Sequence, residues 1–153
     1  MKFQNCLFLI LLIVCLSCQS KKTDKQTGID STLFYTNPVI GGGSEPWAIF
    51  HEGKYYYTQS LADCIILWET DDITQLAEAA KKNVYSPHNG SGISHLWGPE
   101  IHYMDNKWYI YCAADDGNID NRQIYVLENE SPDPMKGEFV MKGRISTDKN
   151  NNL

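Results

Sequence analysis

A repeated hairpin pattern constrains the fold of this chain more than any other feature of its sequence. Residues 46–58 (PWAIFHEGKYYYT) align without gaps on residues 99–111 (PEIHYMDNKWYIY), 53 positions further along. Each copy has a proline, a run of strand-forming residues, an acidic residue followed by a turn former, a lysine and an aromatic-rich strand. Glu-Gly and Asp-Asn between two such runs are typical of β-hairpin turns. The sequence therefore predicts two similar antiparallel units.

Further strand patterns extend both units. A third strand is predicted at residues 65–70 and 124–129, and a weaker fourth strand at 83–85 and 139–142. A short helical pattern at residues 73–82 lies between the last two strands of the first unit. Consecutive four-stranded units with a period in the fifties predict an all-β fold made of β-propeller blades. The alternative is one antiparallel sandwich or barrel of about eight strands.

The number of blades sets a limit on this interpretation. A propeller needs at least four blades to close, and residues 36–153 hold about two. We therefore expect residues 36–153 to be the truncated N-terminal part of a propeller.

The N-terminus has the pattern of an export signal. Lys2 precedes an almost unbroken apolar run at residues 6–16, which is too short to span a bilayer. Residues 15–18 (CLSC) resemble the lipobox of bacterial lipoproteins, in which Cys18 would carry the lipid. We expect residues 1–17 to be a lipoprotein-type signal peptide and 18–35 a polar tether to the outer or cell-surface membrane, on the periplasmic or external side. Ordinary secretion is the alternative.

Composition narrows the classes of partner. The net charge is −6, and the only basic clusters are the pairs at residues 21–22 and 81–82, which argues against binding to nucleic acid. Four Trp and nine Tyr suit a protein that stacks sugars or bases, although aromatic rings also fill small β cores. Cys64 and Cys112 lie in apolar strand patterns and are predicted to be small buried side chains. No zinc-type spacing is present, and we predict no metal site and no cofactor.

Strand direction places several polar segments together. In an antiparallel meander the start of the first strand and the end of the second lie at the same end of the sheet. Glu45 and residues 58–60 therefore share one end with residues 98–100 and 114–116. The connection that follows in the second unit, residues 115–121, is longer and polar. Loops that carry function commonly gather at one end of such a scaffold.

Six segments in the same order resemble the first two blades of glycoside hydrolase family 43. They are residues 42–47 (GGSEPW), 55–58 (YYYT), 66–68 (ILW), 96–103 (LWGPEIHY), 107–111 (KWYIY) and 113–118 (AADDGN). The family comprises five-bladed propeller arabinofuranosidases, arabinanases and β-xylosidases. The resemblance implies an inverting glycosidase that hydrolyses O-glycosyl bonds in arabinose- or xylose-containing plant cell-wall polysaccharides.

The resemblance also implies roles for individual residues. Glu45 stands at the position of the general base, which is usually Asp in the family, while the general acid and a third, pKa-modulating carboxylate belong to the third and fourth blades. We therefore expect this chain to be inactive alone. Trp97, Glu100 and Asp115 are substrate-binding candidates, with packing between blades, a structural role and turn capping as the respective alternatives. A non-catalytic surface glycan-binding lipoprotein and a decayed gene fragment are the alternative functions.

Overall fold

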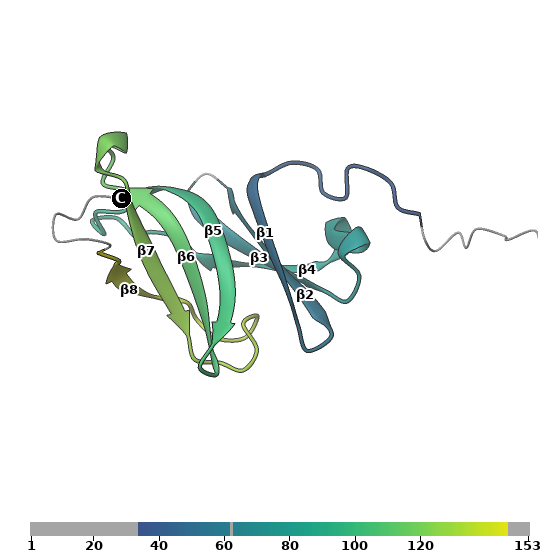
Figure 1. Cartoon of the computed structure of the whole chain (residues 1–153). Helices are drawn as coiled ribbons and strands as arrows, with labels where there is room; N and C mark the ends of the chain where they lie inside the picture. The colour runs from purple at the N-terminus through teal and green to yellow at the C-terminus, as the bar shows by residue number, and fades with distance from the viewer. Residues whose placement is uncertain (1–33, 62, 147–153) are drawn as a thin grey trace, which may run out of the picture. The chain divides into compact units, whose positions relative to one another are not determined.

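The structure is a computed structural model that describes residues 34–61 and 63–146. The predicted signal peptide, Cys18 and most of the predicted tether lie outside the described residues. The described part forms two four-stranded antiparallel sheets, one with strand order β1-β2-β3-β4 and one with order β5-β6-β7-β8 (Figure 1). Within the described ranges, no helix has the length and hydrophobicity needed to cross a membrane.

The first sheet is a meander of consecutive strands. They are β1 (Ser44–His51), β2 (Lys54–Leu61), β3 (Cys64–Thr70) and β4 (Ala80–Tyr85). The pair His51↔Lys54 closes the first hairpin around Glu52 (φ 48°) and Gly53 (φ 84°). Two consecutive residues with positive φ match the twist of the flanking strands, which is why an acidic residue followed by Gly serves here.

The second sheet repeats this plan. Its strands are β5 (Ser94–Met104), β6 (Lys107–Asp115), β7 (Gln123–Asn129) and β8 (Val140–Arg144). Its first hairpin closes at Met104↔Lys107 around Asp105 (φ 50°) and Asn106 (φ 62°). The long polar connection after β6 contains a short 3₁₀ helix, Ile119–Asn121. The predicted repeat and all eight strands are confirmed.

The helical pattern predicted at residues 73–82 ends earlier than expected. A 3₁₀ helix covers Ile73–Glu78, and Asp72 caps it by accepting a hydrogen bond of 2.9 Å from the Thr74 N–H. The chain then enters β4 at Ala80 and pairs with β3. Sheet hydrogen bonds to β3 therefore override the helical propensity of the last residues in the pattern.

The main hydrophobic core lies between the two sheets. Trp108 of β6 is fully buried, and its ring contacts those of Tyr56 and His51 from the first sheet. The other fully buried apolar side chains of this core include Ile65, Leu67, Ile101, Ile110 and Leu127. Both sheets contribute to one core through one face each, as adjacent propeller blades do. The predicted all-β propeller is confirmed over the described residues, and a single sandwich or barrel is not formed.

A smaller cluster covers the other face of the first blade. Tyr57, Trp68 and Leu76 are buried there, with Leu76 supplied by the 3₁₀ helix. Trp47 is half-buried against the main core, and its Nε1–H donates to the Ile101 carbonyl over 3.0 Å. Trp47 and Trp68 are therefore both packing residues of the first blade.

The two described cysteines are free thiols. Cys112 is buried in the main core, and burial raises the pKa of its thiol to about 12. Cys64 is half-buried, and its Sγ–H donates to the Leu61 carbonyl over 3.1 Å. The predicted buried packing role is thus confirmed for Cys112 and wrong for Cys64, which lies next to the turn between β2 and β3 and belongs to neither core cluster.

Candidate functional site

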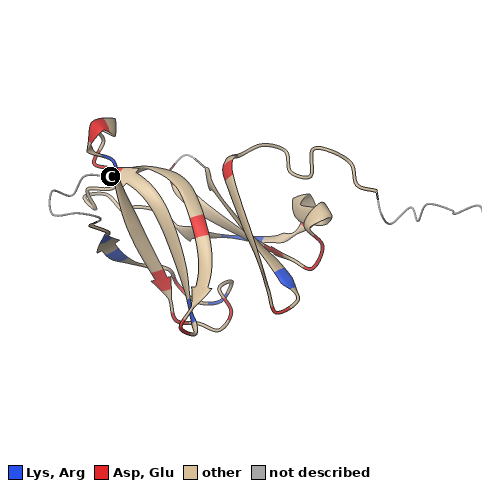
Figure 2. Ribbon diagram, viewed as in Figure 1, with Lys and Arg blue, Asp and Glu red and all other residues tan. Residues whose placement is uncertain are grey.

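One end of the two blades gathers the polar segments that the strand directions predicted. Ser44 pairs with Ser60 at the start of β1, and Ser94 pairs with Asp115 at the start of β5. Each first strand begins where the second strand ends, so the predicted placement of Glu45 and Asp115 at one end of their sheets is confirmed. Figure 2 shows acidic residues at the start of β1 and beside the end of β6.

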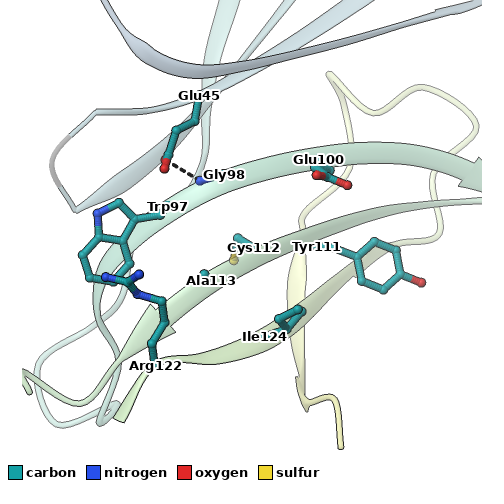
Figure 3. Close-up of a pocket in the computed structure, with 9 residues that line it drawn as sticks. All are labelled: Glu45, Trp97, Gly98, Glu100, Tyr111, Cys112, Ala113, Arg122 and Ile124. Carbon is teal, nitrogen blue, oxygen red and sulfur yellow. Dashed lines mark hydrogen bonds between the residues drawn. The ribbon is translucent and has the colours of Figure 1, made fainter. Parts of the chain in front are cut away.

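Glu45 is turned out of the regular strand. The register of β1 shifts between Ser44 and Trp47, and Glu45 has a left-handed φ of 55°. Its Oε2 accepts a hydrogen bond of 2.6 Å from the backbone N–H of Gly98 in the second blade (Figure 3). The β-bulge thus aims a carboxylate at the neighbouring blade, as bulges near functional sites commonly do.

A pocket of about 440 Å³ opens beside this carboxylate. Its lining combines carboxylate, aromatic and basic side chains with small apolar ones (Figure 3). The lining residues are Glu45, Trp97, Gly98, Glu100, Tyr111, Cys112, Ala113, Arg122 and Ile124. The structure therefore brings together three of the four predicted site residues of the propeller region: Glu45, Trp97 and Glu100.

Trp97 is in contact with a cation. The Arg122 guanidinium lies 4.3 Å from the centroid of the indole ring, a cation–π geometry (Figure 3). The guanidinium therefore covers one face of the indole ring. Sequence reasoning missed Arg122, and its only signal was a basic residue directly after the polar connection at 115–121.

Glu100 and His102 lie two residues apart on β5. The Glu100 carboxylate is exposed, and its Oε2 is 3.6 Å from Nε2 of His102. The His102 ring also contacts Trp47, with centroids 5.3 Å apart, and Tyr111, at 5.6 Å. His102 is thus held by side chains of β1 and β6 and by Glu100 on its own strand.

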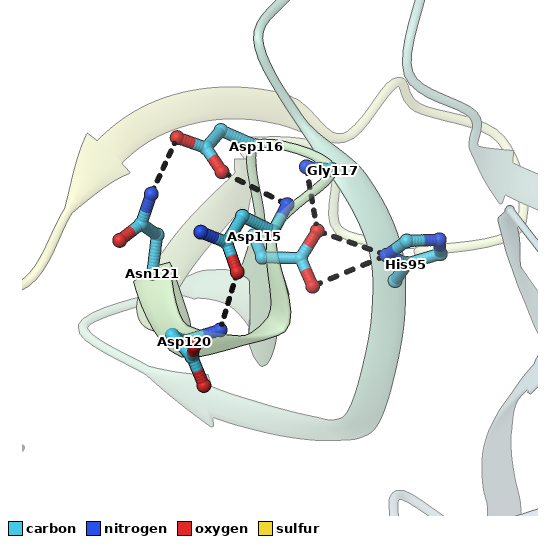
Figure 4. A network of polar contacts seen from close by, with 7 residues as sticks. His95, Asp115, Asp116, Gly117, Asp120 and Asn121 are labelled. Carbon is cyan, nitrogen blue, oxygen red and sulfur yellow. Dashed lines mark hydrogen bonds and ion pairs between the residues drawn. The ribbon is translucent and has the colours of Figure 1, made fainter.

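Asp115 lies apart from the lining of the Glu45 pocket. Its side chain is fully buried, and its Oδ1 accepts from the Gly117 N–H over 2.8 Å (Figure 4). His95 Nδ1 lies 2.9 Å from Oδ1 and 3.1 Å from Oδ2 of the same carboxylate. Sequence reasoning missed His95, because nothing in its local pattern distinguishes it.

The neighbouring Asp116 organises the connection after β6. It accepts from Nδ2 of Asn121 over 2.9 Å and from the Asn118 N–H over 3.1 Å (Figure 4). The Asn121 side chain, followed by the Asn118 backbone N–H, lowers the pKa of Asp116. Among the described residues, no group of three or more His, Cys, Asp or Glu side chains is arranged to hold a metal ion.

Known arabinofuranosidases are similar to most of this chain. Over 122 residues the chain is 34% identical to the extracellular exo-α-(1→5)-L-arabinofuranosidase of Streptomyces avermitilis, covering 76% of this chain and 25% of that protein. Over 118 residues it is 35% identical to the enzyme of the same name from Streptomyces chartreusis, covering 74% and 36%. The crystal structure of α-L-arabinofuranosidase from Lactobacillus brevis matches with a TM-score of 0.68 and 33% identity, covering 74% of this chain and 39% of that one.

These matches cover most of this chain but only part of each relative. The chain spans between a quarter and just over a third of the length of these two curated relatives. The profile of glycosyl hydrolases family 43 matches residues 35–153, which include both blades and every residue of the pocket. This chain belongs to glycosyl hydrolases family 43.

Proposed function

We propose that this protein is an exported glycoside hydrolase that acts on arabinose-containing plant polysaccharides. Family membership supports hydrolysis of glycosidic bonds, and the names of the two Streptomyces relatives support an arabinofuranoside as the sugar. The observation that carries the proposal is the Glu45 carboxylate, which the Gly98 N–H holds at the edge of a pocket lined by Trp97 and Glu100.

Glu45 is the proposed general base. In an inverting glycosidase, one carboxylate removes a proton from the water that attacks the anomeric carbon. Oε2 of Glu45 is held by Gly98, which leaves Oε1 as the oxygen to receive that proton. Glu has one methylene more than the Asp usual at this position, which shifts the carboxylate by about 1.5 Å. The left-handed backbone and the Gly98 N–H hold the longer side chain in one orientation.

Trp97 and Glu100 are the proposed sugar contacts of the same pocket. The Glu100 carboxylate is exposed and accepts hydrogen bonds from hydroxyl groups. The Arg122 guanidinium is stacked on the indole of Trp97 at one side of the pocket. A sugar on the covered face would meet the guanidinium, which donates to sugar oxygens, before it meets the ring. The fully buried Asp115, at the end of β6, lies outside this pocket and contacts His95 and Gly117 instead.

No general acid is assigned among the described residues. Inversion needs a second carboxylic acid to protonate the leaving oxygen, about 6.5–9.5 Å from the base. We therefore expect the 153-residue chain to bind arabino-oligosaccharides without hydrolysing them. Rapid release of nitrophenol from 4-nitrophenyl α-L-arabinofuranoside would show that an acid is present and that this assignment is wrong.

The proposed location follows from residues 1–18 and from the relatives. Both Streptomyces enzymes are named extracellular. We propose that residues 1–17 direct export and that Cys18 carries a lipid anchor. Labelling with radioactive palmitate in a bacterial host should mark the wild-type chain and not Cys18→Ser. Equal labelling of both chains would contradict the anchor, and retention in the cytoplasm would contradict export.

A binding experiment tests the proposed substrate. Isothermal titration calorimetry with α-(1→5)-linked arabinotetraose should show saturable binding, and xylotetraose should bind several-fold more weakly. Glu100→Gln keeps the size of the side chain and removes its charge, so it should weaken arabinotetraose binding, whereas Glu78→Gln on the exposed 3₁₀ helix should not. Absence of binding to arabinotetraose would overturn the proposal, and stronger binding to xylotetraose would overturn the choice of sugar.

A further inference from the structure

A second concave pocket lies at the same end of the blades. It has a volume of about 300 Å³ and is lined mainly by residues 87–95, which connect β4 to β5, together with Asp63. His88, Asn89, Ser91 and His95 present polar side chains to it. Gly90 and Gly92 have open space where a side chain would stand, so the backbone between the polar residues is accessible.

His95 is the most firmly oriented polar side chain of this pocket. Its ring is about half exposed, at 52%, while the Asp115 carboxylate that contacts Nδ1 is fully buried. Because a carboxylate only accepts hydrogen bonds, Nδ1 carries a proton, and in the neutral imidazole Nε2 is then the acceptor. His95 also has a left-handed φ of 47°, a conformation that costs energy for a residue with a side chain. A buried carboxylate and a strained backbone thus combine to present one imidazole nitrogen.

The two pockets adjoin one another. The ring centroids of His95 and Trp97 are 5.5 Å apart, and Trp97 lines the pocket that holds Glu45. A chain of linked sugars that occupies the Glu45 pocket therefore has a second polar concavity beside it. The volume and the mixture of hydrogen-bond donors and acceptors suit one sugar ring with several hydroxyl groups.

We propose that the pocket formed by residues 87–95, named here the His95 pocket, binds a further sugar unit of the oligosaccharide held at Glu45. Nε2 of His95 accepts a hydrogen bond from a hydroxyl group of that unit, and Asp115 is a positioning residue that acts through His95. This inference rests on the proposed function, since it takes a neutral oligosaccharide as the ligand.

The test is nuclear magnetic resonance on the full 153-residue chain titrated with α-(1→5)-linked arabinotetraose. We expect the backbone amide signals of Gly98 and of Gly92 to shift together, because the first reports on the Glu45 pocket and the second on the His95 pocket. His95→Ala should weaken binding about three- to tenfold, as the loss of one hydrogen bond does, and should abolish the shift at Gly92 while the shift at Gly98 persists.

Asp115→Asn provides a readout that a merely structural role would not change. In this variant the amide oxygen continues to accept from Gly117, and the amide nitrogen faces Nδ1 of His95 and donates to it. The imidazole is then forced into the tautomer with hydrogen on Nε2, as ring ¹⁵N chemical shifts will show, and arabinotetraose binding should weaken. Asp116→Asn, a neighbouring carboxylate that contacts Asn121 rather than His95, should change neither the tautomer nor the affinity.

The outcomes separate this inference from the proposed function. A shift at Gly98 without one at Gly92, or an unchanged affinity in His95→Ala, would overturn the His95 pocket and leave the Glu45 site intact. A shift at neither position would overturn both. An unchanged tautomer in Asp115→Asn would refute the positioning role of Asp115.

Discussion

The Glu45 carboxylate accepts a hydrogen bond of 2.6 Å from the backbone N–H of Gly98, which occupies the equivalent position of the next blade. The repeat thus places a side chain of one copy against the main chain of the other. Both residues have left-handed φ angles, 55° and 53°, and each lies where the register of its strand shifts. One contact therefore both joins the blades and orients the proposed base.

Glu45 variants test whether this hydrogen bond joins the blades. Glu45→Ala removes the acceptor and should lower the free energy of unfolding by about 1 kcal/mol. Glu45→Gln keeps an acceptor oxygen for Gly98 and should stay close to the wild type. Ala and Gln at position 45 both have to adopt the same left-handed φ. The difference between the two variants in free energy of unfolding, measured by urea denaturation, therefore reports on the hydrogen bond to Gly98. Equal stability of Glu45→Ala and Glu45→Gln would show that this contact does not join the blades.

A second contact between the blades is buried. Thr58 has no exposed surface, and its hydroxyl donates to the Pro99 carbonyl over 2.6 Å. Thr58→Val keeps the shape and leaves that carbonyl without its donor, so we expect a loss of about 2 kcal/mol in the free energy of unfolding. Thr36→Val, on an exposed residue, is the matched control and should change stability by less than about 0.5 kcal/mol. The prediction fails if the two variants unfold at the same urea concentration.

Two glycines near the site should differ in their tolerance of a side chain. Gly98 has a φ of 53° and open space around its missing Cβ, so Gly98→Ala should cost only the backbone strain, about 1 kcal/mol. Gly43 has a φ of 136°, and a Cβ there would overlap the buried Gln59 side chain, which accepts from the Tyr57 hydroxyl over 2.9 Å. Gly43→Ala should cost about 3 kcal/mol. Thermal unfolding of both variants tests this order, and a reversed order would contradict it.

We predict that the protein loses stability at alkaline pH because two ionisable groups are buried in its core. Burial raises the pKa of the Cys112 thiol from 9.0 to about 12. Burial, followed by the nearby Glu69 and Asp133 carboxylates, raises the pKa of Tyr56 from 10.0 to about 12. Each raised pKa means that the unfolded chain loses its proton first as pH rises. Stability is therefore retained below about pH 9 and falls as pH rises toward 12.

Cys112→Ala tests the contribution of the thiol. The variant should lose stability less steeply between pH 9 and 12 than the wild type, whatever its stability at pH 7. Urea midpoints measured at intervals across that range give the two slopes. Parallel slopes would show that the thiol is not held protonated in the folded chain.

Much of the fold was predictable from local sequence. Glu52-Gly53 and Asp105-Asn106 specify hairpin turns with positive φ at both positions, and the strands on either side follow from β-branched and aromatic residues. The extent of the pattern at residues 73–82 was not predictable, because pairing of β4 with β3 decides where the 3₁₀ helix ends. Short helical patterns are weak signals when a neighbouring strand offers a full set of hydrogen bonds.

The candidate site, like the fold, was predictable from the sequence only in part. The sequence by itself determined the two blades, the shared end of their first strands and the presence of Glu45 and Glu100 there, because the repeat, the turns and the strand directions can be read directly from the order of residues. Only the tertiary structure placed Arg122 over Trp97 and His95 against the buried Asp115, and aimed Glu45 at Gly98. All three contacts join residues 20 or more positions apart in the sequence. They depend on side-chain orientation and on the packing of strands and blades, which no local pattern encodes.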